Sequence, residues 1–421
     1  MAKANNLVIG LDIGTTKICA VVGEISETGA DVVGVGACPS TGLRDGVVVN
    51  IDSTAKSIKR AVEEAELMAG CSIRSVYAGI AGSHIKGFNS DGVVAIAVKG
   101  GEAGQIGMKG GEVGQGDVDR VLEHAGAVAI PADREVIHTL PQEFSVDNQD
   151  GIRDPLGMTG VRLAVKVHIV TGAVSSVQNV IAACHRSDLG VVEVVLESLA
   201  SAKAVLTNEE RELGVALVDI GGGTTDIAIF TNDTIKHTGV IGIGGQKLTN
   251  DIYIGLRTPM NSAEEIKTRY GCALVDLVSP DEVIAVPSVG GREPRRLSRR
   301  LLAEICQPRL EDILDRVEQG LTKSGCKHLI GAGVVLTGGT ALLDGCQELA
   351  EQIFNLPTRI GYPRNVGGLI DVVNDPRYAT AVGLMCYGAE NERTESASGA
   401  RNENFLSRGI KFIGDFFRDI T

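Results

Sequence analysis

Two short stretches of the chain combine a carboxylate, a glycine turn and hydroxyl side chains at matching spacing. The first reads DIGTTK over residues 12–17, and the second reads DIGGGTT over residues 219–225. Successive backbone N–H groups in such turns form a concavity that binds anions. Threonine hydroxyls and the Lys17 ammonium add donors, and a carboxylate just before each turn is suited to a hydrated Mg²⁺. The pattern indicates a phosphate and magnesium site built from two turns.

Each turn joins two apolar runs, which predicts two similar β-hairpins at residues 7–24 and 214–231. Apolar β-branched runs on both sides of a tight glycine turn are typical of a hairpin. Because the unit recurs after about 200 residues, we expect two related domains that face each other. A plain hairpin turn would explain one copy of the motif, but it explains two matching copies poorly.

A third glycine turn follows another apolar run, in the segment GVVLTGGTALLDG at residues 333–345. We expect a strand, then Gly338 and Gly339, then a helix that begins near Thr340. A helix N-terminus directs backbone N–H groups toward a ligand. Taken alone, the segment would be an ordinary turn between a strand and a helix. The sequence contains no Walker A motif, G-x-x-x-x-G-K-[ST].

Composition narrows the class of protein. A chain of 421 residues exceeds one ordinary core, so two or more domains are expected. The net charge of −13 argues against nucleic-acid binding. The nine Cys form no C-x-x-C pair, the seven His show no zinc spacing, and Asp12 interrupts the apolar N-terminal run. These features predict a reducing cytosol and no metal-ligating His. No apolar run approaches the length of about 18 residues that a transmembrane helix needs.

In chain order, the three glycine motifs resemble the phosphate-1, phosphate-2 and adenosine motifs of the actin, sugar-kinase and heat-shock-chaperone ATPase superfamily. Within it, the chain resembles the FtsA family of bacterial cell-division proteins from Leu7 to about Gly388. The closer resemblance lies in residues 61–77, 138–147 (HTLPQEFSVD), 286–297 (VPSVGGREPRRL) and 375–384. It implies an α/β fold of the actin-like ATPase type, with two duplicated ribonuclease-H-like domains around a nucleotide cleft, each carrying a smaller subdomain.

The resemblance also implies an organisation of the chain, which ends in an amphipathic helix. The expected parts are a first actin-like domain (1–84 and 162–207), an inserted small subdomain for self-association and partners (85–161), a second actin-like domain (208–245 and 331–388), a small subdomain on the nucleotide and FtsZ side (246–330), a flexible linker (389–404) and a membrane-targeting helix (405–421). Within the insert, the glycine-rich segment 99–117 is interpreted as a flexible loop.

The implied ligands are ATP and Mg²⁺, and the resemblance assigns residues to each part of them. The terminal phosphates would meet Gly14, Thr15, Thr16 and Lys17 from one domain and Gly222, Gly223 and Thr224 from the other. Magnesium would be held, through water, by Asp12 and Asp219. The adenosine side would be lined by Gly338, Gly339 and Ala341, with Glu264 and Lys267 on the adenine and ribose.

Two of these assignments have open alternatives. Glu264 and Lys267 are three residues apart and share a helix face, but ordinary charge pairs on a solvated helix have the same spacing. Glu197 is the one candidate for orienting an attacking water, because superfamily hydrolases usually carry an acid or amide in its segment. The FtsA family does not reliably carry an acid there, so we expect ATP binding with at most slow hydrolysis.

The run REPRRLSRR at residues 292–300 is basic in an acidic protein. No aromatic residues interleave with it, so stacking on nucleic-acid bases is not supported. A solvated loop and helix start would explain the run as well as an acidic partner would. The resemblance implies that this subdomain accepts the C-terminal tail of FtsZ, the tubulin-like division protein, with Arg295 and Arg296 as candidate contacts.

The segment FLSRGIKFIGDFFRDI, residues 405–420, holds four of the eight Phe in the chain. At about 100° per residue its large apolar side chains fall within an arc of about 160°, namely Phe405, Leu406, Ile410, Phe412, Ile413, Phe416, Phe417 and Ile420. Core helices can show the same pattern. A polar stretch separates the segment from the domains, however, and its apolar face is unusually aromatic. We therefore predict a helix that lies in the membrane interface and binds mainly by insertion.

The expected function is that of an ATP-binding, actin-like polymer on the cytoplasmic face of the inner membrane at the division site. It would be a peripheral protein that anchors FtsZ, associates with itself and recruits later membrane proteins of the divisome. A small-molecule kinase of the same superfamily is the alternative, and it would leave the membrane helix without a purpose. A heat-shock chaperone would need a large domain after the nucleotide fold, and MreB-type shape proteins lack stretches like 138–147.

Overall fold

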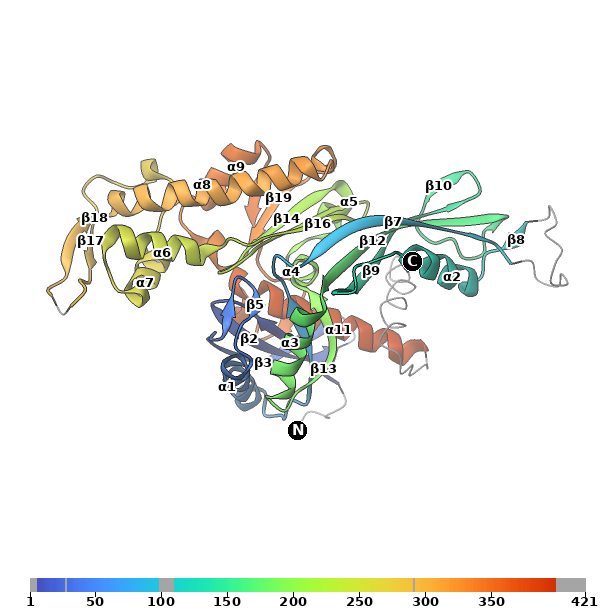
Figure 1. Cartoon of the computed structure of the whole chain (residues 1–421), viewed down its shortest axis with the longest axis horizontal. Coiled ribbons are helices and arrows are strands. Elements are labelled where there is room, and N and C mark those ends of the chain that lie inside the picture. The colour runs from blue at the N-terminus through green and yellow to red at the C-terminus, as the bar shows by residue number, and fades with distance from the viewer. Residues whose placement is uncertain (1–5, 27–28, 98–109, 291, 399–421) are drawn as a thin grey trace.

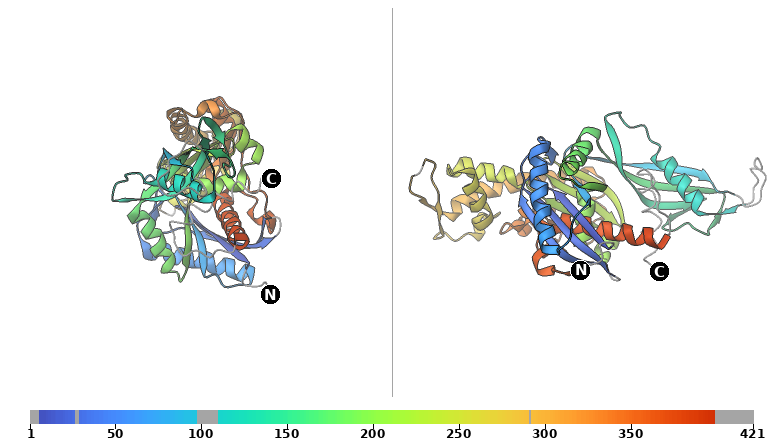
Figure 2. Two further views of the ribbon diagram at one scale, coloured as in Figure 1. Left: turned by 90° about the vertical axis from the view of Figure 1, so that its right-hand side faces the viewer. Right: turned by 90° about the horizontal axis from the view of Figure 1, so that it is seen from below.

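The computed structural model describes residues 6–26, 29–97, 110–290 and 292–398. Two β-sheets form the centre of the molecule, and one arm extends from each side of this centre (Figure 1). Seen from below, the two arms again point in opposite directions (Figure 2, right). The predicted membrane helix, residues 405–421, lies outside the described residues.

The first sheet has six strands in the order β13-β6-β1-β2-β3-β21. Its hairpin pairs β1 and β2 in antiparallel register from Leu7 opposite Glu24 to Ile13 opposite Ile18, as the turn motif predicts. Helices α1 (Ile51–Ala69) and α3 (Val174–His185) pack on one face of this sheet. The bounds of the strands are β1 Leu7–Ile13, β2 Lys17–Ser26, β3 Gly29–Pro39, β6 Ser75–Ile80, β13 Gly190–Leu196 and β21 Gly367–Gly368.

The second sheet has five strands in the order β16-β15-β14-β19-β20. Here the hairpin pairs β14 and β15 from Val215 opposite Phe230 to Ile220 opposite Thr225, so the second turn also forms as predicted. Helices α6, α8 and α9 cover one face. The bounds are β14 Val215–Ile220, β15 Thr225–Thr231, β16 Thr234–Ile241, β19 Gly333–Thr337, β20 Thr358–Ile360, α6 Gly245–Leu256, α8 Arg299–Lys323 and α9 Cys346–Phe354.

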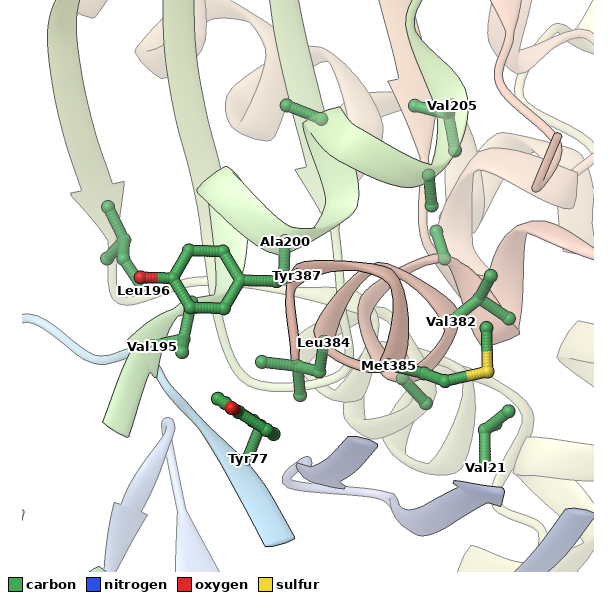
Figure 3. Close-up of a cluster of buried hydrophobic side chains, with 14 of the residues drawn as sticks. Val21, Tyr77, Val195, Leu196, Ala200, Val205, Val382, Leu384, Met385 and Tyr387 are labelled. Atoms are coloured by element: carbon green, nitrogen blue, oxygen red, sulfur yellow. The ribbon is translucent and has the colours of Figure 1, made fainter. Parts of the chain in front are cut away.

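Two helices, α4 (Glu197–Val205) and α11 (Ala379–Ser398), lie between the two sheets. Figure 3 shows Leu384 and Met385 of α11 near Ala200 of α4 and near Val21 and Tyr77 of the first sheet. The same buried cluster contains inward-facing residues of β14, β15 and β19. One hydrophobic layer therefore joins both halves of the molecule.

The arm on the right of Figure 1 contains a four-stranded sheet in the order β10-β9-β12-β7, with α2 packed on it. The insert predicted at 85–161 ends too early, because β12 forms hydrogen-bonded ladders with both β7 and β9. The loop predicted at 99–117 extends too far, since residues from Gly111 onward form β8 and the start of α2. The bounds are β7 Lys86–Ala95, β8 Gly111–Glu112, α2 Gln115–Gly126, β9 Arg134–Val146, β10 Gln149–Ile152, β11 Thr159–Gly160 and β12 Arg162–Ala173.

The arm on the left contains α6, α7 (Met260–Tyr270), the start of α8, and the hairpin of β17 (Val283–Val286) with β18 (Arg295–Ser298). The remaining elements are short: β4 Leu43–Arg44, β5 Val47–Val48, α5 Asn208–Leu213, α10 Ile370–Val373, and the 3-10 turns η1 Val275–Leu277, η2 Lys327–Leu329, η3 Gly339–Leu342 and η4 Pro376–Tyr378. The described residues contain no helix whose length and hydropathy would suit a membrane span.

The start of the predicted linker is wrong, because α11 continues past Gly388 to Ser398. Side chains beyond Gly388 contact α4 and the first sheet: Glu390 pairs with Lys203 of α4, and Asn391 donates to Glu193 of β13 at 3.3 Å. The polar composition of this stretch suggested a tether, but its residues favour helix once tertiary contacts anchor one side.

Candidate functional site

The two hairpin turns meet between the sheets. A Cβ atom built on Gly223 would lie 2.3 Å from Oγ1 of Thr15, and one on Gly222 would lie 2.4 Å from Cγ2 of Thr16. The Thr15 hydroxyl also accepts a hydrogen bond of 2.9 Å from the N–H of Gly46. Only glycine fits at these two positions, so the structure brings the two predicted phosphate turns together.

The carboxylates that precede the turns are both buried, with Asp12 and Asp219 each 8% exposed. Burial raises the pKa of Asp12 to about 6; the Lys17 ammonium opposes this shift, and the Asp219 carboxylate adds to it. Burial also raises the pKa of Asp219, against hydrogen bonds from Ser201 and Thr380 and the charge of Lys17. The Asp219 carboxylate of the second sheet thus affects the pKa of Asp12 in the first sheet.

A third acid, Asp226, belongs to the same group and was absent from the predicted site. It lies directly opposite Asp219 in the β14–β15 ladder and is 3% exposed. Among the described residues its Oδ1 atom has no hydrogen-bond partner. Burial, and after it the charge of Asp219, raises the pKa of Asp226 to about 8, although a hydrogen bond from Thr224 opposes the shift. A charged residue inside the otherwise uncharged strand β15 was the available sequence signal.

Glu197, the candidate for orienting water, is the first residue of α4 and faces these acids. Burial raises its pKa well above the usual range, and the charges of Asp12, Asp226 and Asp219 raise it further. A Cβ atom on Gly79 of β6 would lie 3.1 Å from Cγ of Glu197, so the glycine makes room for this side chain. The structure therefore gathers four carboxyl groups at the cleft.

The carboxyl cluster fits a hydrated magnesium ion. Mg²⁺ prefers oxygen ligands, keeps several of its waters and is commonly bound through one or two carboxylates. The pKa values of Asp12 and Asp219 are raised in spite of the Lys17 charge, and a bound cation would add positive charge to the cluster. In the part of the chain that the structure describes, no three His, Cys, Asp or Glu converge as direct metal ligands. Asp12 and Asp219 are the carboxylates that would hold such an ion through water.

The raised pKa of Asp226 predicts a pH-dependent difference in stability. An Asp with a raised folded-state pKa takes up a proton on folding, so stability falls as pH rises between the unfolded and folded pKa values. Asp226→Asn removes this effect. Without metal, the melting-temperature advantage of the variant over wild type should grow from about pH 5 to about pH 8 and then level off. A constant difference across thermal melts in EDTA would contradict the assigned pKa shift.

Glu264 and Lys267 share one face of α7, as their spacing predicts. Lys267 is 7% exposed, and its Nζ donates to Glu264 at 2.8 Å, to the Thr249 hydroxyl at 2.9 Å and to the Gly245 carbonyl at 3.3 Å. The pair is therefore not an ordinary solvated charge pair. It connects α7 to the first turn of α6.

The N-terminus of α6 forms part of the site that the sequence reading missed. The N–H groups of Gly245 and Gln246 donate to the carbonyls of Gly221 and Gly222, at 2.9 and 2.8 Å. A Cβ on Gly244 would lie 2.6 Å from the Gly221 carbonyl oxygen. The run GIGGQ after β16 was the sequence signal, since glycine is needed where two backbones approach this closely.

The third glycine turn lies beside the carboxyl cluster, but its expected helix is wrong. Gly338 has φ of 84°, and a Cβ there would lie 2.4 Å from Oδ1 of Asp219. From Gly339 to Leu342 the chain forms the single 3-10 turn η3, and α9 starts only at Cys346, because Gly345 adopts φ of 75°. Ala341 packs in the core of the second half.

Lys17 and Gly14, which are predicted to contact phosphate, each have a neighbour within the protein. The Lys17 ammonium donates to the Arg377 carbonyl and lies 4.1 Å from the ring centroid of Tyr378. Gly14 lies close to Asp12, since a Cβ on it would be 3.5 Å from Oδ1 of that residue. The Lys17 charge nevertheless opposes the rise in the pKa of Asp12 and of Asp219, so it lies close enough to act on the cluster.

The candidate partner residues are remote from the cleft, in strand β18 of the left arm (Figure 1). Arg295 donates to the Leu256 carbonyl at the end of α6, which is a structural contact. Arg296 is exposed and lies opposite Ala285 in the β17–β18 ladder. Downstream, Arg299 pairs with Glu282 at 2.9 Å. Part of the basic run therefore stabilises the arm.

Comparison with known proteins agrees with this architecture. Residues 216–383 match the family model "Cell division protein FtsA", and residues 82–171 match the SHS2 domain inserted in FtsA. The second match continues into β12, in agreement with the corrected end of the insert.

Curated relatives cover nearly the whole chain. The cell division protein FtsA of Pseudomonas aeruginosa is 53% identical over 391 residues, which are 93% of this chain and 91% of that protein. FtsA of Escherichia coli K12 is 43% identical and covers 93% of both chains. FtsA of Bacillus subtilis is 37% identical over 93% of this chain and 85% of its own.

Solved structures with low sequence identity share the fold. A PilM–PilN type IV pilus biogenesis complex has a TM-score of 0.62 at 18% identity, covering 91% of this chain and 98% of that chain. MreB5 of Spiroplasma citri bound to ADP has a TM-score of 0.52 at 15% identity, covering 94% and 100%. The fold is thus the actin-like ATPase fold that the resemblance implied. With these relatives and this fold, the chain belongs to the FtsA family of cell-division proteins.

Proposed function

We propose that this protein binds Mg-ATP in the cleft between its two sheets. One observation carries the proposal: two glycine turns, each preceded by a buried Asp, meet face to face where the sheets approach each other. The phosphates would lie between Thr15, Thr16 and Lys17 on one side and Gly222, Gly223 and Thr224 on the other. Gly338 and Gly339, with the α6 N-terminus and Lys267, would border the nucleoside.

Hydrolysis at this site is proposed to be slow. A residue that orients or deprotonates water works best when ionised, with a pKa near the working pH. The raised pKa of Glu197 favours the protonated form of its carboxyl group. A protonated carboxyl group cannot accept a proton from the attacking water, which supports slow hydrolysis.

At the cellular level, we propose a peripheral protein on the cytoplasmic face of the membrane at the division site. It would form homopolymers, hold FtsZ there and help recruit other division proteins. Membership of the FtsA family supports a role in cell division over the alternative of a small-molecule kinase. The membrane contact rests on the sequence of residues 405–420, whose eight large apolar residues fall on one side of a helical projection.

Sedimentation with liposomes tests the proposed anchor. Phe412→Glu combined with Phe416→Glu places two charges in the apolar arc and should lower the membrane-bound fraction at least about tenfold, because insertion of apolar side chains supplies the affinity. Asn404→Glu with Ser407→Glu is the matched control, since it adds the same charge on the polar side. Equal binding of both variants and wild type would refute the anchor. FtsZ should sediment with the liposomes only when the anchored protein is present.

Charge reversal at Arg296 tests the proposed FtsZ surface without disturbing the arm. Arg296→Glu should weaken binding of an acidic FtsZ tail peptide about fivefold to tenfold, since one opposite charge at a partly desolvated contact is worth about 1–1.4 kcal/mol. Fluorescence anisotropy with labelled peptide measures the change, and it should shrink at high salt. Arg316→Glu on the exposed side of α8 is the charge control. Identical peptide affinity of the two variants would exclude Arg296 from the contact.

A further inference from the structure

The Asp219 carboxylate is bound on one side by hydroxyl groups from the two helices between the sheets. Ser201 of α4 donates to Oδ2 of Asp219 at 2.6 Å, and Thr380 of α11 donates to the same oxygen at 3.3 Å. The two hydroxyl oxygens are 3.0 Å apart. Exposed fractions of 0%, 9% and 8% for Ser201, Thr380 and Asp219 place the triad almost entirely away from solvent.

The second carboxylate oxygen of Asp219 has different surroundings. A Cβ atom built on Gly338 would lie 2.4 Å from Oδ1, so this oxygen points at the third glycine turn. One oxygen is therefore held by the helices, and the other lies beside the Gly338 turn.

Ser201 and Thr380 each lie close in sequence to a residue of the candidate site or to a residue that contacts one. Ser201 is four residues after Glu197, so both side chains project from the same face of α4. Thr380 is in the first turn of α11, directly after η4, whose Arg377 carbonyl accepts from Lys17. The orientation of the Asp219 carboxylate thus depends on two helices that are remote from each other in sequence.

Hydrogen bonds to a buried carboxylate are charge-assisted and about twice as strong as neutral ones. Two such bonds to one oxygen fix the side-chain torsions of Asp219 and favour its ionised form. An ionised carboxylate in one fixed rotamer is what a hydrated metal ion requires from this position.

We propose that Ser201 and Thr380 are positioning residues for magnesium, which hold Oδ2 of Asp219 and leave Oδ1 available to a hydrated ion. This inference rests on the proposed Mg-nucleotide function of the cleft. It assigns a metal-dependent role to two hydroxyl groups that otherwise would only satisfy a buried acid. The two roles differ in one measurable respect, which is whether removing the hydroxyls changes magnesium dependence or only stability.

The test measures binding of a fluorescent ATP analogue to the full-length protein over a range of Mg²⁺ concentrations and in EDTA. Ser201→Ala combined with Thr380→Val should raise the Mg²⁺ concentration at half-maximal effect about tenfold, and analogue affinity in EDTA should stay unchanged. Thr380→Ser retains a hydroxyl and should behave like wild type. If the double variant does not fold, Thr380→Val alone is used for the test, because it keeps the shape of the side chain. It should raise the Mg²⁺ concentration at half-maximal effect about threefold.

Ser198→Ala is the matched control. Ser198 belongs to the same helix, is 1% exposed, and its Oγ has no hydrogen-bond partner among the described residues. This variant should leave the Mg²⁺ dependence unchanged. An unchanged Mg²⁺ midpoint in the Ser201 and Thr380 variants, or an equal loss of affinity with and without Mg²⁺, would overturn the positioning role. Absence of Mg-dependent binding in wild type would instead refute the proposed function itself.

Discussion

Replacing Asp12 and Asp219 together with Asn should lower Mg-ATP affinity at least about 100-fold, which corresponds to about 2.7 kcal/mol. The substitutions keep the shape of both side chains and remove the negative charges of the two carboxylates that precede the hairpin turns. A hydrated Mg²⁺ is held mainly by charge, so neutral amides cannot replace the carboxylates. Isothermal titration calorimetry with and without Mg²⁺ measures the loss.

Loss of folding cannot account for this result, because the variant should be at least as stable as wild type without metal. Burial raises the pKa values of Asp12 and Asp219, and the charge of Asp219 adds to the rise at Asp12, so ionisation of these acids disfavours the folded state at neutral pH. Asp281→Asn with Asp315→Asn, both exposed, changes the net charge equally and should leave affinity unchanged. If the Asp12 and Asp219 variant binds Mg-ATP normally, the cleft between the hairpin turns is not the nucleotide site.

Gly383→Ala should destabilise the protein by about 3 kcal/mol or more and lower its melting temperature by about 5–10 °C. Gly383 lies in α11 where this helix crosses α4, and a Cβ there would lie 1.8 Å from the carbonyl oxygen of Ala200. The obstacle is backbone, so the two helices must separate. A gain of about 1 kcal/mol in helix propensity offsets only part of this cost. Thermal melts and urea titrations measure the change.

Gly116→Ala is the matched control for this prediction. Gly116 is also helical, in α2, and a Cβ on it would meet nothing within 4 Å. This variant should be as stable as wild type or slightly more stable. Equal stability of the Gly383 and Gly116 variants would mean that the close approach of α4 and α11 does not support the fold.

Local chemistry explains which parts of the site could be predicted. The hairpins around Gly14 and Gly222 formed as expected, because a tight glycine turn between apolar β-branched runs has few other solutions. Their repetition indicated two facing domains, and family resemblance supplied the cleft. The same local rules failed after Gly338, where a second glycine with positive φ, Gly345, delayed the helix.

Long-range pairing explains what was missed. Whether β12 belongs to the insert or to the first domain depends on ladders with β7 and β9, which no local pattern specifies. The polar residues after Gly388 appeared to form a linker, but contacts of Glu390 and Asn391 with the body keep them helical.

The sequence by itself determined the two Asp-Ile-Gly turns, because turn chemistry acts between near neighbours, and family resemblance implied the actin-like architecture. The amphipathic C-terminal segment stays a prediction from hydrophobic periodicity. Only the tertiary structure decided how the site is completed. Asp226 acquires its role from the Asp219 carboxylate across a strand ladder, and Ser201 and Thr380 meet that carboxylate from separate helices. Burial and hydrogen bonding in three dimensions give these ordinary residues their proposed chemistry, since charges and hydroxyls interact strongly only where water is excluded.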